Sequence, residues 1–356
     1  CLPMIGFGQV YIPDANFKAY LVGNTAINTN GDNEIQVSEA TAFNDTINCS
    51  NMNIYDLTGV EAFTDLTYLD CSLNDLPTLN VNSNTALISL NTSYNPLSGL
   101  DVSNNISLEY LNCSSAWWTF PLTNLDVSAN TALTELWCHN NQLTSLDVSQ
   151  NTALTNLICG DNQLTSLDVS QNTALNSLDC RINQLTSLDV SNNLALTDFL
   201  SCYGNQLTSL DVSNNTALEG LNCEQNQLTS LDVSNNLALT GLNCSYNQLT
   251  SLDVSANINL TNLNCWNNQF TNLDVSNNIA LTELFCYENQ ITSLDVSNNF
   301  ALIKLFCFSN QLTNLDVRNG NNTNIYDYAF STANNPNLYC INVDDAAWAT
   351  TNWPDI

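Results

Sequence analysis

Aspartates recur along the sequence at a nearly constant spacing. If 21 residues make one coil of a stacked structure, neighbouring carboxylates lie roughly 5 Å apart, which matches the pair in a retaining glycosidase. The coil imposes this spacing, so it carries no catalytic information. We expect hydrogen bonds from nearby Ser, Thr or backbone N–H groups to offset the repulsion, and loosely held cations are the alternative. The aspartates stand at positions 101, 126, 147, 168, 189, 211, 232, 253, 274, 295 and 316.

Residues for acid–base or nucleophilic catalysis are scarce. His139 is the only histidine, and the sequence has no Gly-x-Ser-x-Gly elbow, phosphate-binding loop or paired zinc motif. His139 also stands at a position that varies between repeats, which favours a surface contact over a general base. We therefore expect a protein without enzymatic activity.

A polar segment from Asn28 to Glu39 has the spacing of a twelve-residue calcium loop. It lies between two predicted helices, with Ile35 at the apolar position. Asn28 replaces the usual Asp at position one, and Asn33 replaces the usual Gly at position six, although Asn tolerates the left-handed conformation. Calcium binding and a capped polar turn both remain open. The candidate calcium ligands are Asn28, Asn30, Asp32, Glu34 and Glu39.

Eleven of the 14 cysteines recur at one apolar position of the repeat, and Thr92 takes that position in one further coil. Stacked in register, their Cβ atoms would be about 4.8 Å apart, beyond the roughly 3.5 to 4.5 Å that a disulfide prefers. We expect free, buried thiols that fill the core. A thiolate metal site is not expected, because the row has no histidine. The cysteines are Cys71, Cys113, Cys138, Cys159, Cys180, Cys202, Cys223, Cys244, Cys265, Cys286 and Cys307.

These groups are carried by a repeat of 21 residues, exemplified by LTELWCHNNQLTSLDVSQNTA from Leu133. SAWWTFPL brings four extra residues between Cys113 and Cys138, and DFLSCYG brings one. We expect both insertions to form outward loops. The other units begin at Leu66, Leu87, Leu108, Leu154, Leu175, Leu196, Leu218, Leu239, Leu260, Leu281 and Leu302.

Each unit contains two short strand patterns, L-x-x-L-x-C and L-x-x-L-x-V. Alternate residues of a strand share a face, so Leu136 and Cys138 point inward while Trp137 and His139 point outward. Neither half is long enough for a helix. One coil cannot bury enough apolar surface to offset its ordering entropy, so the coils must stack. The predicted fold is mainly β: a right-handed parallel solenoid with short strands on both sides of each coil.

The pattern L-x-x-L-x-C-x-x-N-x-L resembles the leucine-rich-repeat signature, and L-x-x-L-D-V-S-x-N is similar to a bacterial subclass with a 21-residue repeat. The resemblance covers residues 66 to about 317. It says little about function, because the fold carries many kinds of binding protein. The whole chain also resembles exported surface proteins that commonly end in a type IX secretion sorting domain, which implies that the sequence is cut short at Ile356.

The ends of the chain depart from the repeat and predict caps. IPDANFKAYLVG reads as a short helix, and Trp348 and Trp353 are expected to cover the last coil. Cys1 as a lipidated residue is the alternative to a signal remnant. No later segment has the 18 uninterrupted apolar residues that indicate a membrane span. We divide the chain into a signal-peptide remnant (1–9), an N-terminal helical cap and entry coil (10–65), a leucine-rich-repeat solenoid (66–317) and a C-terminal cap (318–356).

The outward positions of the first strand vary between repeats, whereas the positions around them are nearly constant. A fixed scaffold that varies one surface is suited to binding. Aromatic residues, which favour protein contacts and stacking on sugar rings, gather in the last three coils. The alternative is that the C-terminal segment folds over this stripe. The predicted ligand-binding face contains Trp137, His139, Tyr203, Trp266, Phe285, Tyr287, Phe306 and Phe308.

Composition limits the partners. The sequence has 34 acidic and four basic residues and a formal net charge of −30, which repels nucleic acid and anionic lipid. We predict a secreted or cell-surface protein that recognises a protein or a glycan through the variable strand face, including adhesion. The alternatives are a structural spacer that presents another domain, and ice or mineral binding, which rows of charged residues serve poorly.

Overall fold

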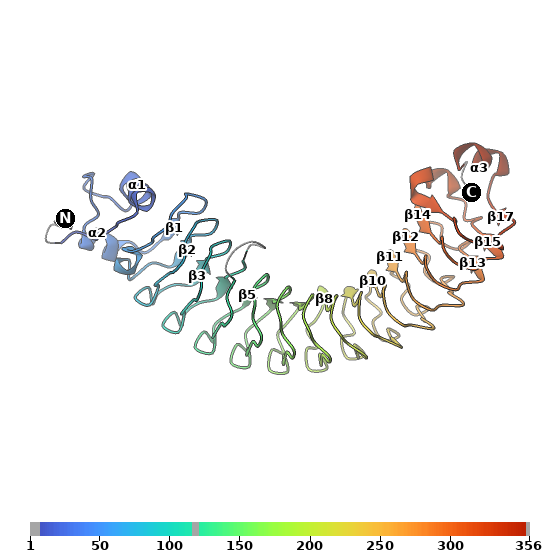
Figure 1. The fold of residues 1–356 in the computed structure, drawn as a ribbon, viewed down its shortest axis with the longest axis horizontal. Helices are drawn as coiled ribbons and strands as arrows, with labels where there is room; N and C mark the ends of the chain where they lie inside the picture. The colour runs from blue at the N-terminus through green and yellow to red at the C-terminus, as the bar shows by residue number, and fades with distance from the viewer. Residues whose placement is uncertain (1–7, 116–120, 354–356) are drawn as a thin grey trace. The chain divides into compact units, whose positions relative to one another are not determined.

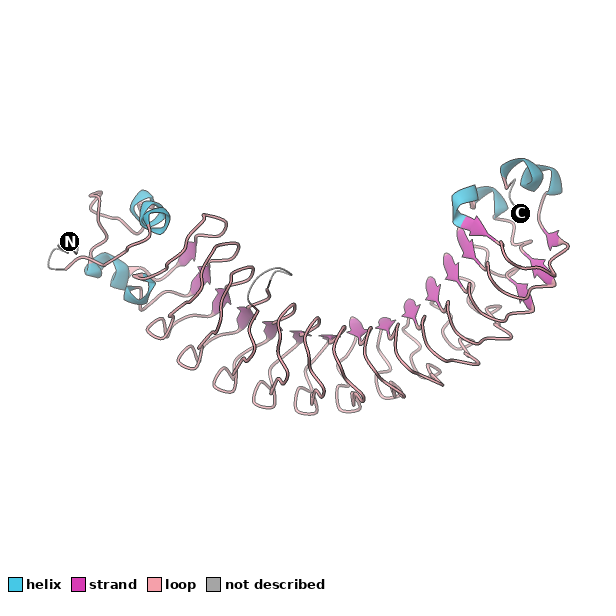
Figure 2. Ribbon diagram, in the orientation of Figure 1, coloured by secondary structure: helices cyan, strands magenta, loops and turns pink. Residues whose placement is uncertain are grey.

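The computed structural model describes residues 8–115 and 121–353, in two compact units, Cys1–Ala174 (unit 1) and Leu175–Ile356 (unit 2). In each unit the chain winds into a parallel β-solenoid whose coils each contribute a short strand (Figure 1). The α-helices lie outside the repeated coils (Figure 2). The predicted fold class, a mainly β solenoid with a small helical N-terminal cap, is confirmed.

The sheet of unit 1 is parallel and keeps the leucines of successive coils in register. Leu69 pairs with Leu90, and Leu136 pairs with Leu157. The extra residues of SAWWTFPL fall largely outside the described residues, but Leu111 still pairs with Leu136 across them. The strands of unit 1, in spatial order, are β1 (Thr46–Asn48), β2 (Tyr68–Asp70), β3 (Ser89–Asn91), β4 (Tyr110–Asn112), β5 (Glu135–Trp137) and β6 (Asn156–Ile158).

Unit 2 repeats the same arrangement. The extra residue of DFLSCYG lies before β8 and leaves the register intact, since Leu178 pairs with Leu200. The strands on this side are β7 (Ser177–Asp179), β8 (Phe199–Ser201), β9 (Gly220–Asn222), β10 (Gly241–Asn243), β11 (Asn262–Asn264), β12 (Glu283–Phe285), β14 (Lys304–Phe306) and β16 (Phe330–Ser331).

The second side of the coils differs from the expectation of a strand in every coil. Among the described residues it forms strands only at β13 (Ser293–Asp295), β15 (Asn314–Asp316) and β17 (Ile341–Asn342). Ser149 N donates to Asp147 Oδ1 and Asn151 N donates to Val148 O, and the same local bonds recur next to β13, where Ser297 N donates to Asp295 Oδ1 and Asn299 N donates to Val296 O. These local bonds are therefore common to coils with and without a second strand.

Leucine, cysteine and valine columns form the core, as predicted. Leu136, Cys138 and Val148 are all fully buried. The cysteines of the row are free and buried, and Cys49 on the coil of β1 extends the row by one member. Burial raises the pKa of Cys113, Cys244 and Cys286 to about 12. These thiols therefore stay protonated and act as core filler.

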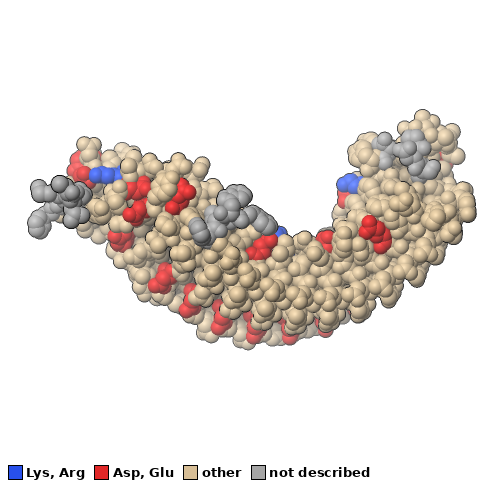
Figure 3. Space-filling view, in the orientation of Figure 1, with Lys and Arg blue, Asp and Glu red and all other residues tan. Residues whose placement is uncertain are grey.

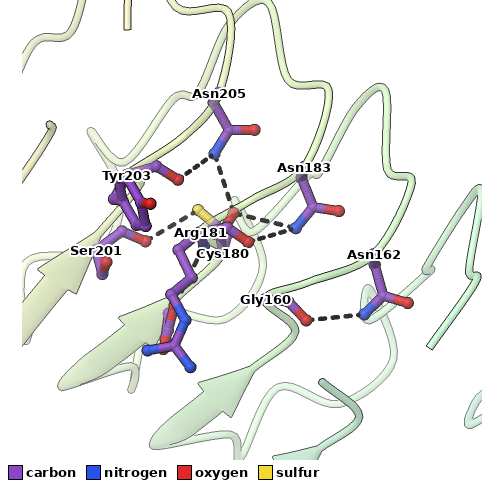
Figure 4. A network of polar contacts seen from close by, with 9 residues as sticks. Gly160, Asn162, Cys180, Arg181, Asn183, Ser201, Tyr203 and Asn205 are labelled. Atoms are coloured by element: carbon purple, nitrogen blue, oxygen red, sulfur yellow. Dashed lines mark hydrogen bonds and ion pairs between the residues drawn. The ribbon is translucent and has the colours of Figure 1, made fainter. Parts of the chain in front are cut away.

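Two columns of buried asparagine hold the coils together. In the first, Asn205 Nδ2 donates to the carbonyl oxygens of Cys180 (3.1 Å), Cys202 (3.0 Å) and Tyr203 (3.4 Å), as Figure 4 shows in part. In the second, Asn257 Nδ2 donates to Val233 O at 3.0 Å and Asn236 O at 2.9 Å. Both columns join adjacent coils, because these asparagines satisfy backbone carbonyl groups of their own coil or of the preceding one.

The N-terminal cap contains helices α1 (Ala15–Gly23) and α2 (Val37–Ala42) and the 3-10 turn η1 (Val60–Ala62). Asp14 caps α1, because its carboxylate accepts from Asn16 N and Phe17 N. The expected signal remnant and the Cys1 alternative fall mostly or wholly on residues 1–7, outside the described residues.

At the other end, β16 and β17 continue the coil pattern beyond residue 317. The short turns η2 (Asn322–Asn324) and η3 (Asp327–Ala329) precede β16, and helix α3 (Ala346–Asn352) follows β17. Trp353 is buried beside Phe330, and its Nε1 donates to Ile325 O at 3.0 Å. Of the helices within the described ranges, none is long and apolar enough to cross a membrane.

Candidate functional site

Four aromatic rings of unit 2 form a continuous column across four coils. Tyr246 meets Trp266 edge-on, with ring centroids 4.3 Å apart and 71° between the planes. Trp266 stacks on Tyr287 at 4.7 Å and 20°, and Tyr287 stacks on Phe308 at 4.3 Å and 14°. We call these four residues the aromatic column. Register of the strands below them sets this contact, because one coil delivers one ring.

A second aromatic pair lies on the strands themselves. Phe285 of β12 pairs in register with Phe306 of β14, and their rings stack at 5.2 Å and 10°. The rings of the pair and of the column are partly exposed. The structure thus brings together the five aromatic residues predicted for the last three coils.

Stacking decides which part of each ring a ligand meets. The faces of Trp266 and Tyr287 lie against one another, and Phe308 lies against the other side of Tyr287. A sugar ring or a planar cation binds to an aromatic face. The inner rings of the column, Trp266 and Tyr287, instead offer mainly their edges, which carry the positive part of the quadrupole.

A groove of about 220 Å³ opens on the same side of unit 2, over β9 and β10. Its walls include Phe199 at one end and Phe285 at the other. Gly241 lies open, because a Cβ built there would meet no atom within 4 Å. A Cβ at Gly220 would come within 2.7 Å of the Phe199 ring. Gly220 therefore accommodates Phe199, whereas Gly241 leaves space.

Polar groups line the groove beside the glycines. Asn222, Asn243 and Asn264 stand at the same position of three neighbouring strands. Asn264 Oδ1 is buried and has no hydrogen-bond partner among the described atoms. Glu283, at one end, pairs with Lys304 at 2.6 Å. Asn222, Asn243 and Asn264 thus bring amide groups to the lining of the groove.

Carboxylates flank the aromatic column. Glu224 accepts from Asn243 Nδ2 at 2.7 Å, and Glu288 accepts from Asn267 Nδ2 at 3.1 Å. The pKa of Tyr287 is raised to about 12. Burial of the phenol is the largest cause, and the nearby Glu288, Tyr246 and Glu224 also raise it. The phenol of Tyr287 thus remains a hydrogen-bond donor beside two acidic groups.

The other predicted face residues lie elsewhere. Trp137 and His139 belong to unit 1, where the Trp137 ring contacts Tyr110 edge-on at 5.7 Å. Tyr203 follows β8 in unit 2 and is partly exposed. The C-terminal segment places Ser331 beside Phe306, so β16 extends the strand face of unit 2.

The recurring aspartates make the hydrogen bonds expected of them. Asp147 Oδ1 accepts from Ser149 N at 2.9 Å, and the same bond recurs down the row, as between Asp253 and Ser255. These bonds hold the pKa of Asp147 and Asp253 below the usual range. Acidic side chains recur along the lower edge in Figure 3. The row is therefore a set of capped, ionised turns.

Of the five candidate calcium ligands, Asn28, Asn30, Asp32 and Glu34 lie in the loop between α1 and α2, and Glu39 lies in the first turn of α2. Glu39 Oε1 accepts from Thr29 N and Asn30 N, and Oε2 accepts from Gln36 N. Asn30 Oδ1 accepts from Asp32 N, and Glu34 pairs with Lys18 at 2.7 Å.

These bonds give the arrangement of the capped polar turn. Asn28 is buried, and its amide donates to Val22 O and Asp32 O. Within residues 8–115 and 121–353, no group of three or more His, Cys, Asp or Glu side chains is placed to hold a metal ion. Calcium binding stays a prediction.

Two parts of this site escaped the sequence reasoning. Tyr246 immediately precedes Asn247, which belongs to the first column of buried asparagine, and it has a positive φ of 50°. Asn267 and Glu288, at the equivalent position of the next two coils, also have a positive φ. Tyr246 was not counted among the outward strand positions, yet its ring begins the column. The groove was missed because only two glycines, Gly220 and Gly241, mark it in the sequence.

Solved structures of similar proteins share this fold. The functional domain of InlJ from Listeria monocytogenes, described as including a cysteine ladder, is 38% identical, with a TM-score of 0.74; the match covers 88% of this chain and 72% of that one. An internalin (inlF) from the same organism is 21% identical, with a TM-score of 0.76 and coverage of 97% and 99%.

A Leptospira interrogans leucine-rich-repeat protein, LIC12759, is 25% identical, with a TM-score of 0.63 and coverage of 74% and 78%. No protein-family model matches the sequence, and no curated protein matches it. The cysteine row therefore has a counterpart in a solved bacterial structure.

Proposed function

We propose that this chain, which belongs to the leucine-rich-repeat family, binds another protein through the strand face of unit 2. The proposal rests on the aromatic column, because the coils do not require aromatic residues at these positions in order to fold. The buried positions of the coils of unit 2 are nearly constant, and the column position of Trp266 and Tyr287 holds Ser245 in the preceding coil. Folding therefore does not explain the aromatic residues.

Ring geometry favours a protein over a glycan as the partner of the column. Sugar recognition by aromatic residues uses an open ring face, and the facing sides of Trp266, Tyr287 and Phe308 are occupied by one another. Ring edges are suited to contacts with apolar side chains, peptide carbonyls and other aromatic rings. Aromatic residues are also enriched in the central part of protein interfaces.

Charge favours a partner with basic residues. Glu224 and Glu288 flank the column, and unit 2 carries 17 acidic residues against Arg181, Lys304 and Arg318. Lysine or arginine on the partner would meet these carboxylates at the rim of the interface, where complementary charge raises the association rate.

A short glycan in the groove is the second candidate. The amides of Asn222, Asn243 and Asn264 suit sugar hydroxyls, and Asn264 Oδ1 lacks a partner among the described atoms. Phe285 belongs both to the groove wall and to the stacked pair. A glycan bound here would occupy the space above Gly241 and would be independent of the column.

The proposal includes a location outside the cell or at its surface, and adhesion as one role. The apolar first residues of the sequence support export, and type IX secretion rests on the resemblance of the whole chain to exported surface proteins. If the solenoid only serves as a spacer, neither the column nor the groove has a ligand.

The test compares matched variants of the whole chain. Trp266, Tyr287 and Phe308 are changed to Ser, the residue that the coil of Ser245 already carries. The control changes Tyr55, Tyr326 and Tyr339 to Ser, three exposed aromatic residues outside the column. Each protein is immobilised and presented with surface extracts and a glycan array. Loss of a protein ligand in the first variant alone supports the proposal, and equal binding by both contradicts it.

The groove has its own variant. Gly241→Asn fills the space above β10 with a residue that β11 carries at the equivalent position, Asn262. Loss of a glycan signal in Gly241→Asn, with retention in the column variant, would support the second candidate. Absence of any ligand for the wild-type protein would favour the spacer.

A further inference from the structure

A row of large apolar side chains is exposed in the turns of unit 2, outside the strands. Leu237, Ile258, Ile279 and Phe300 lie on four successive coils, each directly after an asparagine of the second buried column. These four residues are 56%, 57%, 56% and 60% exposed, respectively. We call these four residues the apolar row.

The members of the row are neighbours in space. Asn257, Asn278 and Asn299, which precede three of them, each donate through Nδ2 to the carbonyl of the equivalent asparagine one coil earlier, at 2.9 Å. Because the residue before each member is bonded from coil to coil, the four apolar side chains form one contiguous surface.

The repeats supply an internal control for this surface. The equivalent position is an exposed threonine in other coils, namely Thr131, Thr152, Thr173 and Thr216. Leu194 and Ile106 are isolated apolar residues at this position, each between threonines. The fold therefore does not require apolar residues here. A contiguous exposed patch of this kind marks an interaction surface.

Carboxylates accompany the row on the same coils. Asp232, Asp253 and Asp274 stand five residues before Leu237, Ile258 and Ile279 and are exposed. Their pKa values are lowered by hydrogen bonds from the serines two residues later in the sequence, Ser234, Ser255 and Ser276.

No basic residue of unit 2 is closely paired with these three carboxylates in the described structure. Arg181 pairs with Asp179, Lys304 with Glu283, and Arg318 with Asp316. An apolar surface whose coils also carry uncompensated negative charge is complementary to a positively charged, amphipathic ligand.

Other occupants fit this surface less well. Four side chains at this exposure offer on the order of 400 Å², about half of what each partner of a stable complex buries. A second copy would also bring the same carboxylates against these ones. Anionic lipid is repelled for the same reason.

We infer that the apolar row, together with Asp232, Asp253 and Asp274, docks a cationic amphipathic segment of another protein. Apolar side chains of the segment cover Leu237, Ile258, Ile279 and Phe300, and its lysines or arginines meet the three aspartates. This surface is distinct from the aromatic column and the groove, so its test does not depend on the proposed function.

The experiment uses the full chain and a fluorescent synthetic peptide of leucine and lysine with amphipathic helical spacing. Binding is followed by anisotropy at low salt and at high salt. One variant changes the four row residues to Thr, and the other changes Asp232, Asp253 and Asp274 to Asn. Both should fold, because Thr216 occupies the row position in its own coil and Asn80 occupies the aspartate position, where its Oδ1 accepts from Asn82 N at 3.1 Å.

We expect each variant to weaken binding by at least about tenfold, and we expect high salt to weaken binding by the wild type. The control variant at Tyr55, Tyr326 and Tyr339 should bind the peptide as the wild type does. Equal binding of a leucine–glutamate peptide, or unchanged binding by the threonine variant, would overturn the inference. So would wild-type binding to phosphatidylserine vesicles, or dimerisation that the threonine variant loses in sedimentation.

Discussion

The ring of Trp266 lies 4.7 Å from the ring of Tyr287, with 20° between their planes. Each ring therefore covers one face of the other, and a ligand reaches mainly their edges. Strand register sets this relationship, because Asn264 of β11 pairs with Phe285 of β12 two residues before each ring.

A double-mutant cycle measures this contact. Trp266→Ser, Tyr287→Ser and the double variant are unfolded in urea. Stacked aromatic pairs contribute about 0.5 to 1.5 kcal/mol beyond area burial, so we expect a coupling energy in that range. A coupling energy near zero would show that the rings do not stack in solution.

The two glycines of the groove should respond differently to a side chain. Gly220→Ala places a Cβ within 2.7 Å of the Phe199 ring and should lower the free energy of unfolding by about 1 to 3 kcal/mol. Gly241→Ala should change it by less than about 0.5 kcal/mol, because its Cβ meets no atom within 4 Å. The additional change Phe199→Ala should remove most of the Gly220→Ala penalty. Equal effects at both glycines would contradict the described groove.

Loss of an asparagine from the first buried column should lower the free energy of unfolding. Asn247 Nδ2 donates to Cys223 O at 3.0 Å and Cys244 O at 3.1 Å, and its Oδ1 accepts from Leu228 N at 3.0 Å. Asn247→Ala leaves these buried groups without partners, so we expect a loss of about 2 to 5 kcal/mol. Asn235→Ala, which removes an exposed amide, is the control. Similar urea midpoints for the two variants would be evidence against the ladder.

The cysteines should differ in reactivity. Cys340 is exposed, whereas the cysteines of the row are buried and free. Burial raises the pKa of Cys244 to about 12, and the thiolate is the reactive form. Among the described cysteines, iodoacetamide should therefore label Cys340 in the native protein and the row only after unfolding. Rapid native labelling of Cys244, detected by mass spectrometry, would contradict this arrangement.

Acid should weaken the N-terminal cap through Glu39. Desolvation raises the pKa of Glu39, but hydrogen bonds from Gln36, Asn30 and Thr29 lower it by more, so the folded value lies below the unfolded value of about 4.3. The stabilisation is fully present above pH 4.3 or so and is lost as the pH falls through the folded pKa. Glu39→Gln should be less stable at pH 7 and less sensitive to acid. Parallel pH profiles for the two proteins would contradict the prediction.

The same pair of proteins tests calcium. A capped polar turn predicts that millimolar calcium leaves the melting temperature of the wild type unchanged. A calcium-dependent rise that Glu39→Gln abolishes would instead support calcium binding by Asn28, Asn30, Asp32, Glu34 and Glu39.

Sequence reasoning was most successful where one repeat constrains the next. The spacing of Leu136 and Leu157 predicted their register, and the row containing Cys138 and Cys159 predicted a buried column. The leucine register and the cysteine column both follow from the stacking of coils, which places equivalent residues of successive coils above one another. The second strand of each coil was predicted too often, because the pattern L-x-x-L-D-V occurs both in a coil that forms this strand, at β15, and in coils that do not.

The site was less predictable because it depends on how side chains meet between coils. Trp266, Tyr287 and Phe308 were predicted to share a face, but the choice between exposed faces and exposed edges is set by their mutual angles. Tyr246 joins them from a left-handed turn position. The apolar row was overlooked because its members lie in turns, outside the strand positions that were compared between coils.

The most direct test of the account is ligand capture by the full chain with and without the aromatic column. The column variant at Trp266, Tyr287 and Phe308 and the control variant at Tyr55, Tyr326 and Tyr339 are immobilised at equal density beside the wild type. Captured surface proteins are then quantified by mass spectrometry. The account predicts a protein that the wild type and the control retain and the column variant loses. Identical captured proteins on all three surfaces would contradict it.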